Sequence, residues 1–155
     1  MRGAQAFDYP TRMTEPVVPQ WTLRCDGGSR GNPGPGALGY VLVDPKGKEV
    51  EARGEALGVV TNNVAEYQAL IAGLEAAAVH GVERLLVCMD SELVVRQLRG
   101  EYRVKHPALK LLHQKAVTAA GKIPHVKYRE VPREENARAD QLVNETLDMQ
   151  GERSL

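Results

Sequence analysis

The sequence is poor in cysteine, in long apolar runs and in net charge. Two cysteines in 155 residues do not make a disulfide framework, so a reducing, cytoplasmic setting is expected. No apolar run approaches the roughly 18 residues that a membrane span needs, and the N-terminus lacks the apolar core of a secretory signal. Twenty basic residues balance twenty acidic ones, and zero net charge taken alone argues against nucleic-acid binding.

The length predicts one domain with its own core. Residues 1–20 contain three prolines and no clean periodicity, which predicts a flexible N-terminal extension. The domain is expected over residues 21–150, with a short tail over 151–155. A split into two smaller domains would leave neither half with a sufficient core.

Hydrophobic periodicity and turn signals give the element order β-β-β-α-β-α-α-β-α. The expected strands are 21–26, 37–44, 48–57, 84–89 and 124–131. A long helix is expected between the caps at 61–63 and Gly81, a short one after Asp90 and Ser91, another from Pro107, and a last one over 134–150. The Gly- and Pro-rich residues 26–36 predict a turn or loop. Three hairpin-linked strands followed by alternating helices and strands predict an α/β fold, with a mixed sheet and helices packed on it.

Local signals set several helix boundaries. Residues 61–63 offer N-caps for the first long helix, and Gly81 is a plausible residue just past its end. Asp90 and Ser91 can cap the short helix. Leu109, Leu112, Ala116 and Val117 are expected on one buried stripe of the next helix.

Four acidic residues stand where α/β proteins place functional groups. Asp26 and Asp90 follow strands, whereas Glu66 and Asp140 lie early in helices. If the two strands are neighbours, these carboxylates converge and repel one another unless a cation neutralises them. Oxygen ligands of this kind suit Mg²⁺ or Mn²⁺, in the layout of a two-metal phosphoryl-transfer site.

Each acid also has an ordinary structural interpretation. Asp26 can be a turn residue before Gly27, and Asp90 a helix N-cap. Glu66 can complete a capping arrangement with Asn62 or Asn63, and Asp140 can be a solvated helix residue. Taken singly, these readings are favoured over a catalytic role.

Four motifs together resemble the type 1 ribonuclease H family, whose members cut RNA in RNA–DNA hybrids. They read DGGSRGNPGPG at 26–36, TNNVAE at 61–66, MDS at 89–91 and NARAD at 136–140. The likeness covers about residues 21–149 and keeps the order of the family motifs. It implies the ribonuclease H-like fold, a mixed five-stranded sheet of order 3-2-1-4-5 with strand 2 antiparallel, flanked by helices.

The same resemblance implies the chemistry of the site. Asp26, Glu66, Asp90 and Asp140 would be the catalytic, metal-binding carboxylates, holding two Mg²⁺ ions with Mn²⁺ as an alternative. Hydrolysis in this family leaves 5′-phosphate and 3′-hydroxyl ends. The partner is an RNA–DNA hybrid, with double-stranded RNA as a further candidate, and the chain is expected to be a monomer without membrane contact.

Substrate contacts are implied for the Gly-rich turn, the TNN box and the loop before the last helix. Short polar side chains and glycine backbone can approach the 2′-hydroxyls that distinguish RNA from DNA. Thr61 matches a position that contacts DNA-strand phosphate. One of the two box asparagines can alternatively serve only as the helix N-cap. The implied residues are Gly27, Gly28, Ser29, Asn32, Thr61, Asn62, Asn63, Arg133 and Asn136.

Three departures from the family pattern indicate a shorter, archaeal-like branch. Residues 131–136 contain no His, and Arg133 stays protonated, so we expect it to contact phosphate rather than act as a base. Glu92 stands where relatives often carry Gln, which leaves a base contact there in doubt. The basic protrusion is missing, although residues 101–133 carry eight cations against two acids, for a net charge of +6. That run is either a grip on the DNA strand or a solvated surface.

Two further expectations follow from the residues. Strand alternation places Cys25 and Cys88 on opposite sheet faces, so they should remain free, buried thiols. The zero net charge becomes a basic stretch beside acidic segments, and the acidic segments include the four metal-demanding carboxylates. The alternatives to a hybrid-cutting endonuclease are a non-catalytic hybrid- or duplex-binding module and another nuclease of the same fold.

Overall fold

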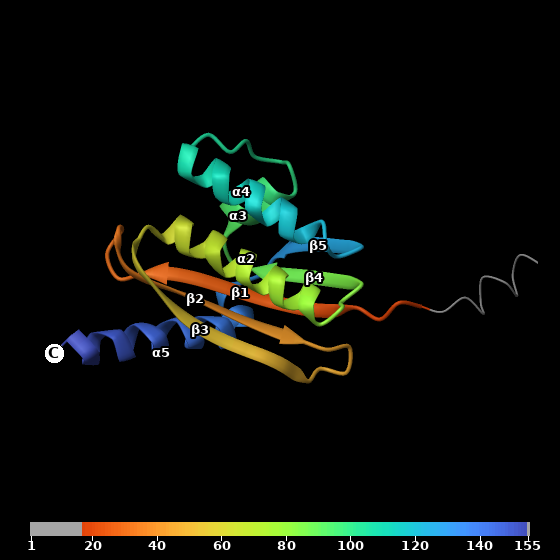
Figure 1. The fold of residues 1–155 in the computed structure, drawn as a ribbon, viewed down its shortest axis with the longest axis horizontal. Helices are drawn as coiled ribbons and strands as arrows, with labels where there is room; N and C mark the ends of the chain where they lie inside the picture. The colour runs from red at the N-terminus through yellow and green to blue at the C-terminus, as the bar shows by residue number, and fades with distance from the viewer. Residues whose placement is uncertain (1–16, 155) are drawn as a thin grey trace, which may run out of the picture.

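The sheet has the strand order β3-β2-β1-β4-β5, as the resemblance implies. The computed structural model describes residues 17–154 (Figure 1). The strands are β1 (Trp21–Ser29), β2 (Gly34–Val43), β3 (Glu49–Val60), β4 (Arg84–Met89) and β5 (His125–Glu130). Strand β2 pairs antiparallel with β1 and β3, whereas β1, β4 and β5 are mutually parallel. The mixed sheet predicted from the sequence is therefore confirmed.

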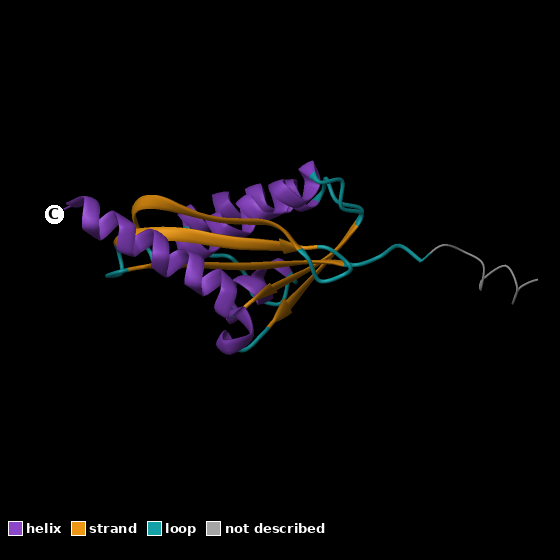
Figure 2. Ribbon diagram, turned by 90° about the horizontal axis from the view of Figure 1, so that it is seen from below, coloured by secondary structure: helices purple, strands orange, loops and turns teal. Residues whose placement is uncertain are grey.

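Helices cover the two faces of this sheet. They are α2 (Asn62–Val79), α3 (Glu92–Leu98), α4 (Pro107–Ala120), the 3-10 turn η1 (Arg133–Asn136) and α5 (Ala137–Ser154). Helix α2 packs on β1 and β2, and α4 packs on α2, so both lie on one side of the sheet (Figure 1). Helix α5 crosses the opposite side over β1, β2 and β3 (Figure 2). Among these described elements, no helix combines the length and apolarity that crossing a membrane would require.

The main core fills the space between the sheet and α2, α3 and α4. Its largest fully buried side chains include Leu23, Tyr67, Leu70 and Leu74. A smaller apolar cluster packs α5 against the sheet through Ala37, Val143 and Leu147. This second layer is thin because glycines in β2 and β3 bring α5 close to the strands: a Cβ at Gly39 would lie 2.6 Å from the Ala139 carbonyl oxygen.

Of the predicted capping residues, Thr61, Gly81 and Ser91 are confirmed, whereas Asn62 and Asn63 already lie within α2 and Asp90 is not the cap of α3. The Thr61 hydroxyl accepts a hydrogen bond from the Val64 amide at 3.2 Å and starts α2. Gly81, with φ of +71°, follows the end of that helix. The Ser91 hydroxyl accepts from the Val94 amide at 3.3 Å and starts α3.

Three boundaries and one packing expectation differ from the sequence prediction. The loop expected at 26–36 is mostly strand, because the β1–β2 ladder continues to the Ser29–Gly36 pair. Strand β3 likewise runs on to Val60. The last α-helix starts at Ala137 after the 3-10 turn and extends to Ser154, past the predicted end. Val117 is 51% exposed, because the buried stripe of α4 continues from Ala116 through Ala119 instead.

The two cysteines lie on opposite faces, as predicted. Cys25 belongs to the main core, whereas Cys88 packs with Leu86 and Val131 on the other side of the sheet. Both thiols are buried and free.

Candidate metal centre and nucleic-acid interface

Three carboxylates from separate elements meet at one end of the sheet. Asp26 lies on β1, Glu66 in the second turn of α2, and Asp90 directly after β4. One oxygen from each lies within 4.8 Å of the other two. The parallel register pairs Arg24 with Cys88, so Asp26 and Asp90 stand two residues further along neighbouring strands. The convergence predicted from the sequence is therefore present in the structure.

Gly27 fixes the distance between the first two acids. Its amide donates a hydrogen bond of 2.7 Å to Glu66 Oε1. A Cβ at this position would lie 2.2 Å from the carbonyl carbon and oxygen of Ala65. The main chains of β1 and α2 therefore touch directly, and a larger residue would push Asp26 and Glu66 apart.

The electrostatics of this cluster favour a bound cation. Burial, the charge of Asp90 and a hydrogen bond with Asp140 raise the pKa of Asp26 from 3.8 to about 7. Burial and the charges of Asp26 and Asp90 raise the pKa of Glu66 well above its usual value. Asp26 is only 8% exposed, so water screens the repulsion weakly. An oxygen-only donor set fits a hard divalent cation such as Mg²⁺ better than zinc.

Asp140 borders this cluster without joining the mutual 4.8 Å group. It lies in the first turn of α5 and is close enough to Asp26 to share a hydrogen bond. Its own oxygens accept from Arg133 at 3.4 Å and from Asn144 at 3.2 Å. The structure thus brings three of the four predicted acids into contact and places the fourth at the edge.

Asn136 is a neighbour of the acids rather than an exposed surface group. It is 1% exposed, and its Nδ2 donates to the Cys25 carbonyl at 2.7 Å and to Asp90 Oδ1 at 3.2 Å. No described group donates to its Oδ1 atom. Such burial does not favour the direct substrate contact expected from the sequence. The side chain instead ties η1 to β1 and orients one carboxylate of the site.

The Gly-rich turn and the TNN box interlock beside the acids. Asn62 Oδ1 accepts from the Ser29 amide at 2.9 Å and from the Ser29 hydroxyl at 3.1 Å. The Asn62 amide donates to Asn32 Oδ1 at 3.0 Å. Gly28 leaves open space here, since a Cβ would meet its nearest neighbour, Val143, only at 3.9 Å. Gly28, Ser29, Asn32 and Asn62 therefore form one rigid group, which we call the polar rim.

A groove of about 670 Å³ runs along this rim toward the start of α4. Asn32, Thr61, Asn62 and Asn63 line it on one side, and His106 lines it on the other. No role for His106 is predicted from the sequence. The sequence feature that points to His106 is its position directly before Pro107, at the start of a helix. Its Nδ1 accepts a hydrogen bond from the Ala108 amide at 3.2 Å and so caps α4.

The structure shows the surroundings of Arg133 and Glu92, two positions where the sequence departs from the family pattern. Arg133 is 75% exposed beside Asp140. Glu92 is ion-paired with Arg96 at 3.3 Å, one helical turn on, and is 55% exposed. Within the described residues, Glu92 is not one of the three clustered acids.

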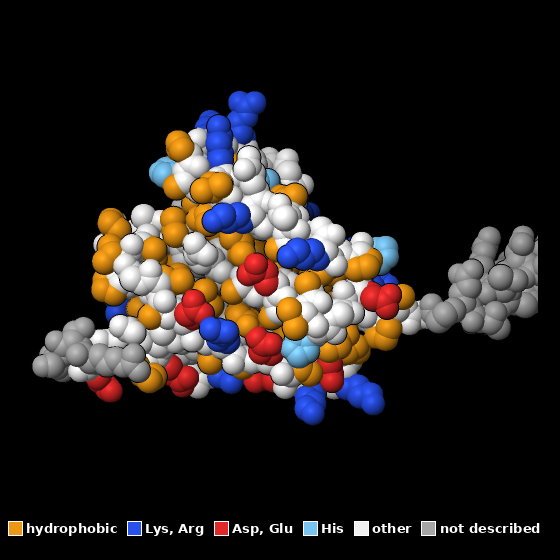
Figure 3. All heavy atoms as spheres, viewed as in Figure 1, with side chains coloured by type: hydrophobic (Ala, Val, Ile, Leu, Met, Phe, Trp, Pro, Cys, Tyr) orange, Lys and Arg blue, Asp and Glu red, His pale blue; other side chains and the backbone are white. Residues whose placement is uncertain are grey.

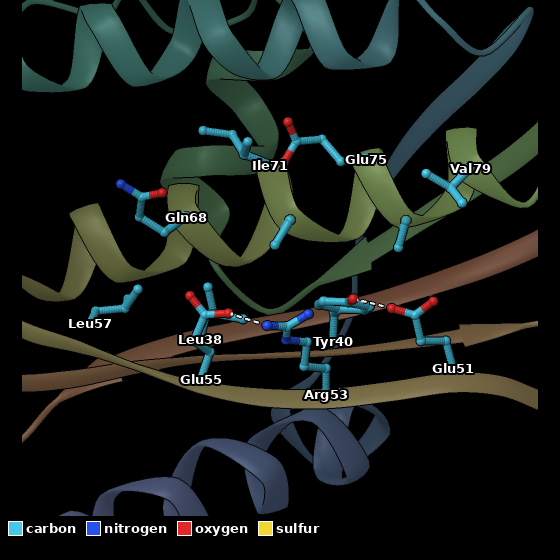
Figure 4. Close-up of a pocket in the computed structure, with 12 residues that line it drawn as sticks. Leu38, Tyr40, Glu51, Arg53, Glu55, Leu57, Gln68, Ile71, Glu75 and Val79 are labelled. Atoms are coloured by element: carbon cyan, nitrogen blue, oxygen red, sulfur yellow. Dashed lines mark hydrogen bonds and ion pairs between the residues drawn. The ribbon is translucent and has the colours of Figure 1, made fainter.

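A second polar cluster lies at the far side of α2 from the acids, in a groove of about 440 Å³ (Figure 4). Here Glu51 accepts hydrogen bonds from the Tyr40 hydroxyl and from His80, the latter at 3.0 Å. The neighbouring Arg53 pairs with Glu55 at 2.9 Å. We call Tyr40, Glu51 and His80 the edge cluster.

Comparison with known protein sequences finds close relatives. A family described as "Reverse transcriptase-like" matches residues 24–146. The chain is 45% identical over 127 residues to the bifunctional protein Rv2228c of Mycobacterium tuberculosis, across 81% of this chain and 35% of that protein. It is 43% identical over 143 residues to ribonuclease HI of Halobacterium salinarum, across 90% of this chain and 72% of that protein. The chain therefore spans about a third of the mycobacterial relative and most of the archaeal one.

Solved structures agree with these matches. Ribonuclease H1 of Halobacterium salinarum superposes with a TM-score of 0.81 at 43% identity, over 83% of this chain and 98% of that one. LC11-RNase H1, isolated from compost, has been solved in complex with an RNA/DNA hybrid. That structure superposes with a TM-score of 0.79 at 43% identity, over 84% of this chain and 98% of that one.

Proposed function

Because the chain belongs to the ribonuclease HI family, we propose that it is a metal-dependent endonuclease that hydrolyses the RNA strand of RNA–DNA hybrids. The observation that carries this proposal is the meeting of Asp26, Glu66 and Asp90 within 4.8 Å at one end of the sheet. The raised pKa values of Asp26 and Glu66 are those of acids that need a cation to be fully ionised together. The products would carry 5′-phosphate and 3′-hydroxyl ends.

The group that these acids would hold is Mg²⁺, as two ions, with Mn²⁺ as an alternative. Bound Mg²⁺ would activate water and stabilise the leaving 3′ oxygen. Asp26, Glu66, Asp90 and Asp140 would be the ligands, with Asp140 completing the set from α5. Gly27 and Asn136 would hold the ligands in place, the first by its amide and close packing, the second through Asp90.

The polar rim would bind the substrate on both sides of the reacting phosphate. Asn62 offers its Nδ2 atom, because its Oδ1 already accepts from Ser29 and no described group accepts from Nδ2. Asn63 lines the same groove, and Thr61 stands at its edge to meet a DNA phosphate. The rim would recognise the 2′-hydroxyls of the RNA strand through short polar groups, with Ser29, Asn32 and the backbone of Gly28 completing it.

Arg133 would bind a phosphate oxygen rather than move a proton. A guanidinium stays charged at every working pH, so it cannot act as a base. Its exposure and its position beside Asp140 allow it to reach the reacting strand. The absence of His from residues 131–136, together with the direct passage from α3 to α4, supports placement in a short, archaeal-like branch without the basic protrusion.

Cleavage of a circular RNA–DNA hybrid in Mg²⁺ tests the proposal. An endonuclease opens the circle, whereas an exonuclease of the same fold leaves it intact and a non-catalytic binding module leaves every substrate intact. Parallel assays with double-stranded RNA and with a single ribonucleotide in DNA define the substrate class. Activity of Asp90→Asn equal to that of the unmodified chain would overturn the site assignment.

Lys105 and Lys110 test whether α4 helps to grip the DNA strand. Both flank the start of α4, next to the rim groove. Neutralising both should flatten the dependence of hybrid binding on salt, by up to about two in the log–log slope. An unchanged slope would assign these lysines to solvated surface instead.

A further inference from the structure

One face of the sheet extends beyond the helix that covers it. Helix α5 packs on β1, β2 and β3, and the same face of β4 and β5 continues past it (Figure 2). On this face lie Leu86 and Cys88, which are only 8% and 2% exposed. Both contact Val131 in a small cluster of their own. Something other than a helix therefore shields these two side chains from water.

Long basic side chains provide that cover. The register pairs Leu86 with Lys127 and Cys88 with both Arg24 and Arg129. The charges of Arg24 and Arg129 reach the Cys88 thiol, since they oppose the rise in its pKa that burial causes. The aliphatic stems of such residues pack on apolar surface while their charged ends remain in water.

These cations have no carboxylate partners, unlike most of the other arginines whose side chains the structure describes. Six arginines form ion pairs with carboxylates, namely Arg30, Arg53, Arg96, Arg99, Arg133 and Arg138. Among the described residues, Arg84, Lys127 and Arg129 pair with no carboxylate, and Arg24 donates only to the Glu135 carbonyl oxygen at 2.9 Å. Strand alternation places all four on the same face. We call Arg24, Arg84, Lys127 and Arg129 the open basic face.

The open basic face begins at the metal centre. Arg24 is two residues before Asp26, so the two lie about 7 Å apart along the same side of β1. Lys127 and Arg129 are also two residues apart, and Arg129 is separated from Arg24 only by β4. The basic stretch predicted over residues 101–133 is thus divided by the sheet. Its α4 part lies with α2, and its β5 part lies on the α5 side.

We propose that the open basic face binds the phosphate groups of a nucleic-acid strand that extends beyond the metal centre. The occupant is the outer part of the substrate itself, because the face is continuous with the acids and its four cations have no carboxylate partners among the described residues. An acidic protein segment would meet the same charge but would have no reason to be aligned with the catalytic end of the sheet. The inference rests on the proposed function and extends it to the length of substrate that the protein prefers.

The test compares hybrids of two lengths with a double variant, Lys127→Gln with Arg129→Gln. Anisotropy in EDTA measures binding without cleavage, using labelled hybrids of about 8 and about 24 base pairs. For the longer hybrid, the log–log salt slope should decrease by about two and the affinity at low salt should fall about 10-fold. The shorter hybrid, which fits within the rim and the metal centre, should bind the variant as it binds the unmodified chain.

Two matched variants separate charge from packing. Lys46→Gln with Lys48→Gln removes the same charge at the β2–β3 turn, toward the opposite edge of the sheet. This control should leave the salt slopes of the short and the long hybrid unchanged. Lys127→Arg with Arg129→Lys keeps the charges and long stems, and should restore the slope. A thermal transition shows whether the double variant is folded. If it is not, Lys127→Gln alone, which leaves Arg129 over Cys88, should give half the decrease in salt slope.

Each outcome decides the inference independently of catalysis. Equal losses on the short and long hybrids, or an unchanged slope on the long one, would overturn it. Failure of the unmodified chain to cleave any hybrid would instead contradict the proposed function while leaving the EDTA binding result intact. Preferential loss of binding to an acidic peptide, with hybrid binding unchanged, would assign the face to a protein partner and overturn the inference.

Discussion

Two groups of acidic side chains flank α2, and they have opposite surroundings. At the metal centre, Asp26 and Glu66 have other acids as close charged neighbours, and their pKa values are raised. In the edge cluster, Glu51 accepts hydrogen bonds from Tyr40 and His80, and its pKa is lowered. The edge cluster is complete with the chain's own groups, whereas the metal centre needs a cation from outside.

This difference is a better guide to function than the size of a cavity. The edge groove is well defined, but Glu51, Arg53 and Glu55 in it already have partners within the chain (Figure 4). The carboxylates at the metal centre carry an unbalanced charge that the fold does not neutralise. Seen from the α2 side, basic side chains without acidic ones lie over α4 at the top of the view, whereas acidic, basic and apolar side chains mix below it (Figure 3).

The largest effect should come from removing one acid of the metal centre. Asp90→Asn should reduce hybrid cleavage by at least about 10³-fold, the scale of losing a catalytic group. It should also raise the free energy of unfolding of the metal-free protein, because a source of repulsion is removed. Initial rates and urea titrations measure the two changes. Glu92→Gln is the matched control, and activity loss of equal size in this ion-paired residue would contradict the comparison.

A substitution at Asn136 tests whether its hydrogen bond orients Asp90 for metal binding. Asn136→Ala should weaken Mg²⁺ binding by about 10–100-fold, because Asp90 loses its donor. Thermal shift against Mg²⁺ concentration measures this affinity without turnover. Asn144→Ala, which removes a donor to the bordering Asp140, should have a smaller effect. Loss of thermal stability with unchanged Mg²⁺ affinity would show that Asn136 is only structural.

The two acidic groups should respond to pH in opposite directions. The pKa of Asp26 is raised in the folded state to about 7, so its contribution to stability is present below its ordinary value of 3.8 and is lost as pH rises through 7. Metal-free protein should lose about 2–4 kcal/mol of unfolding free energy across this range. Saturating Mg²⁺ should flatten the curve. A flat curve in EDTA would contradict the crowding of these acids.

Glu51 should show the opposite and smaller dependence. Its pKa is lowered in the folded state, so its contribution is present above the ordinary value of 4.5 and is lost as pH falls. Glu51→Gln should cost about 1 kcal/mol near neutral pH, the value of a typical hydrogen bond, and less in acid. Urea titrations at two pH values measure this. Glu55→Gln, in an exposed ion pair, should change stability little.

Much of this arrangement could be predicted from local sequence. Asp26 lies on β1 and Asp90 directly after the neighbouring β4, and Thr61 and Ser91 carry the signals of helix starts, so element order and local chemistry suffice to predict them. The turn predicted at Gly27 and Gly28 is wrong, because both residues lie in β1. Glycine-rich composition usually indicates a turn, whereas Gly27 here allows close packing against α2. The local sequence does not distinguish a glycine that allows close packing from a glycine that forms a turn.

Other features depend on contacts between distant segments. Asn136 lies 111 residues from Cys25 and 46 from Asp90, and only the folded chain shows that it bonds to both and is buried. Val117 has the periodicity of a core residue, yet the buried stripe of α4 continues through Ala119 and leaves Val117 exposed. The basic stretch 101–133 is continuous along the chain but is separated by the sheet, which sequence proximity alone cannot reveal.

The direct contact of main chains at Gly27 has a consequence for heat. Side chains loosen on warming before a sheet and its helix separate, so sites built on long side chains can lose their geometry early. Here the spacing of Asp26 and Glu66 is set by one backbone resting on another and by an amide hydrogen bond. The centre should therefore keep its shape up to the temperature at which the domain itself unfolds, so that thermal inactivation and global unfolding occur as one event.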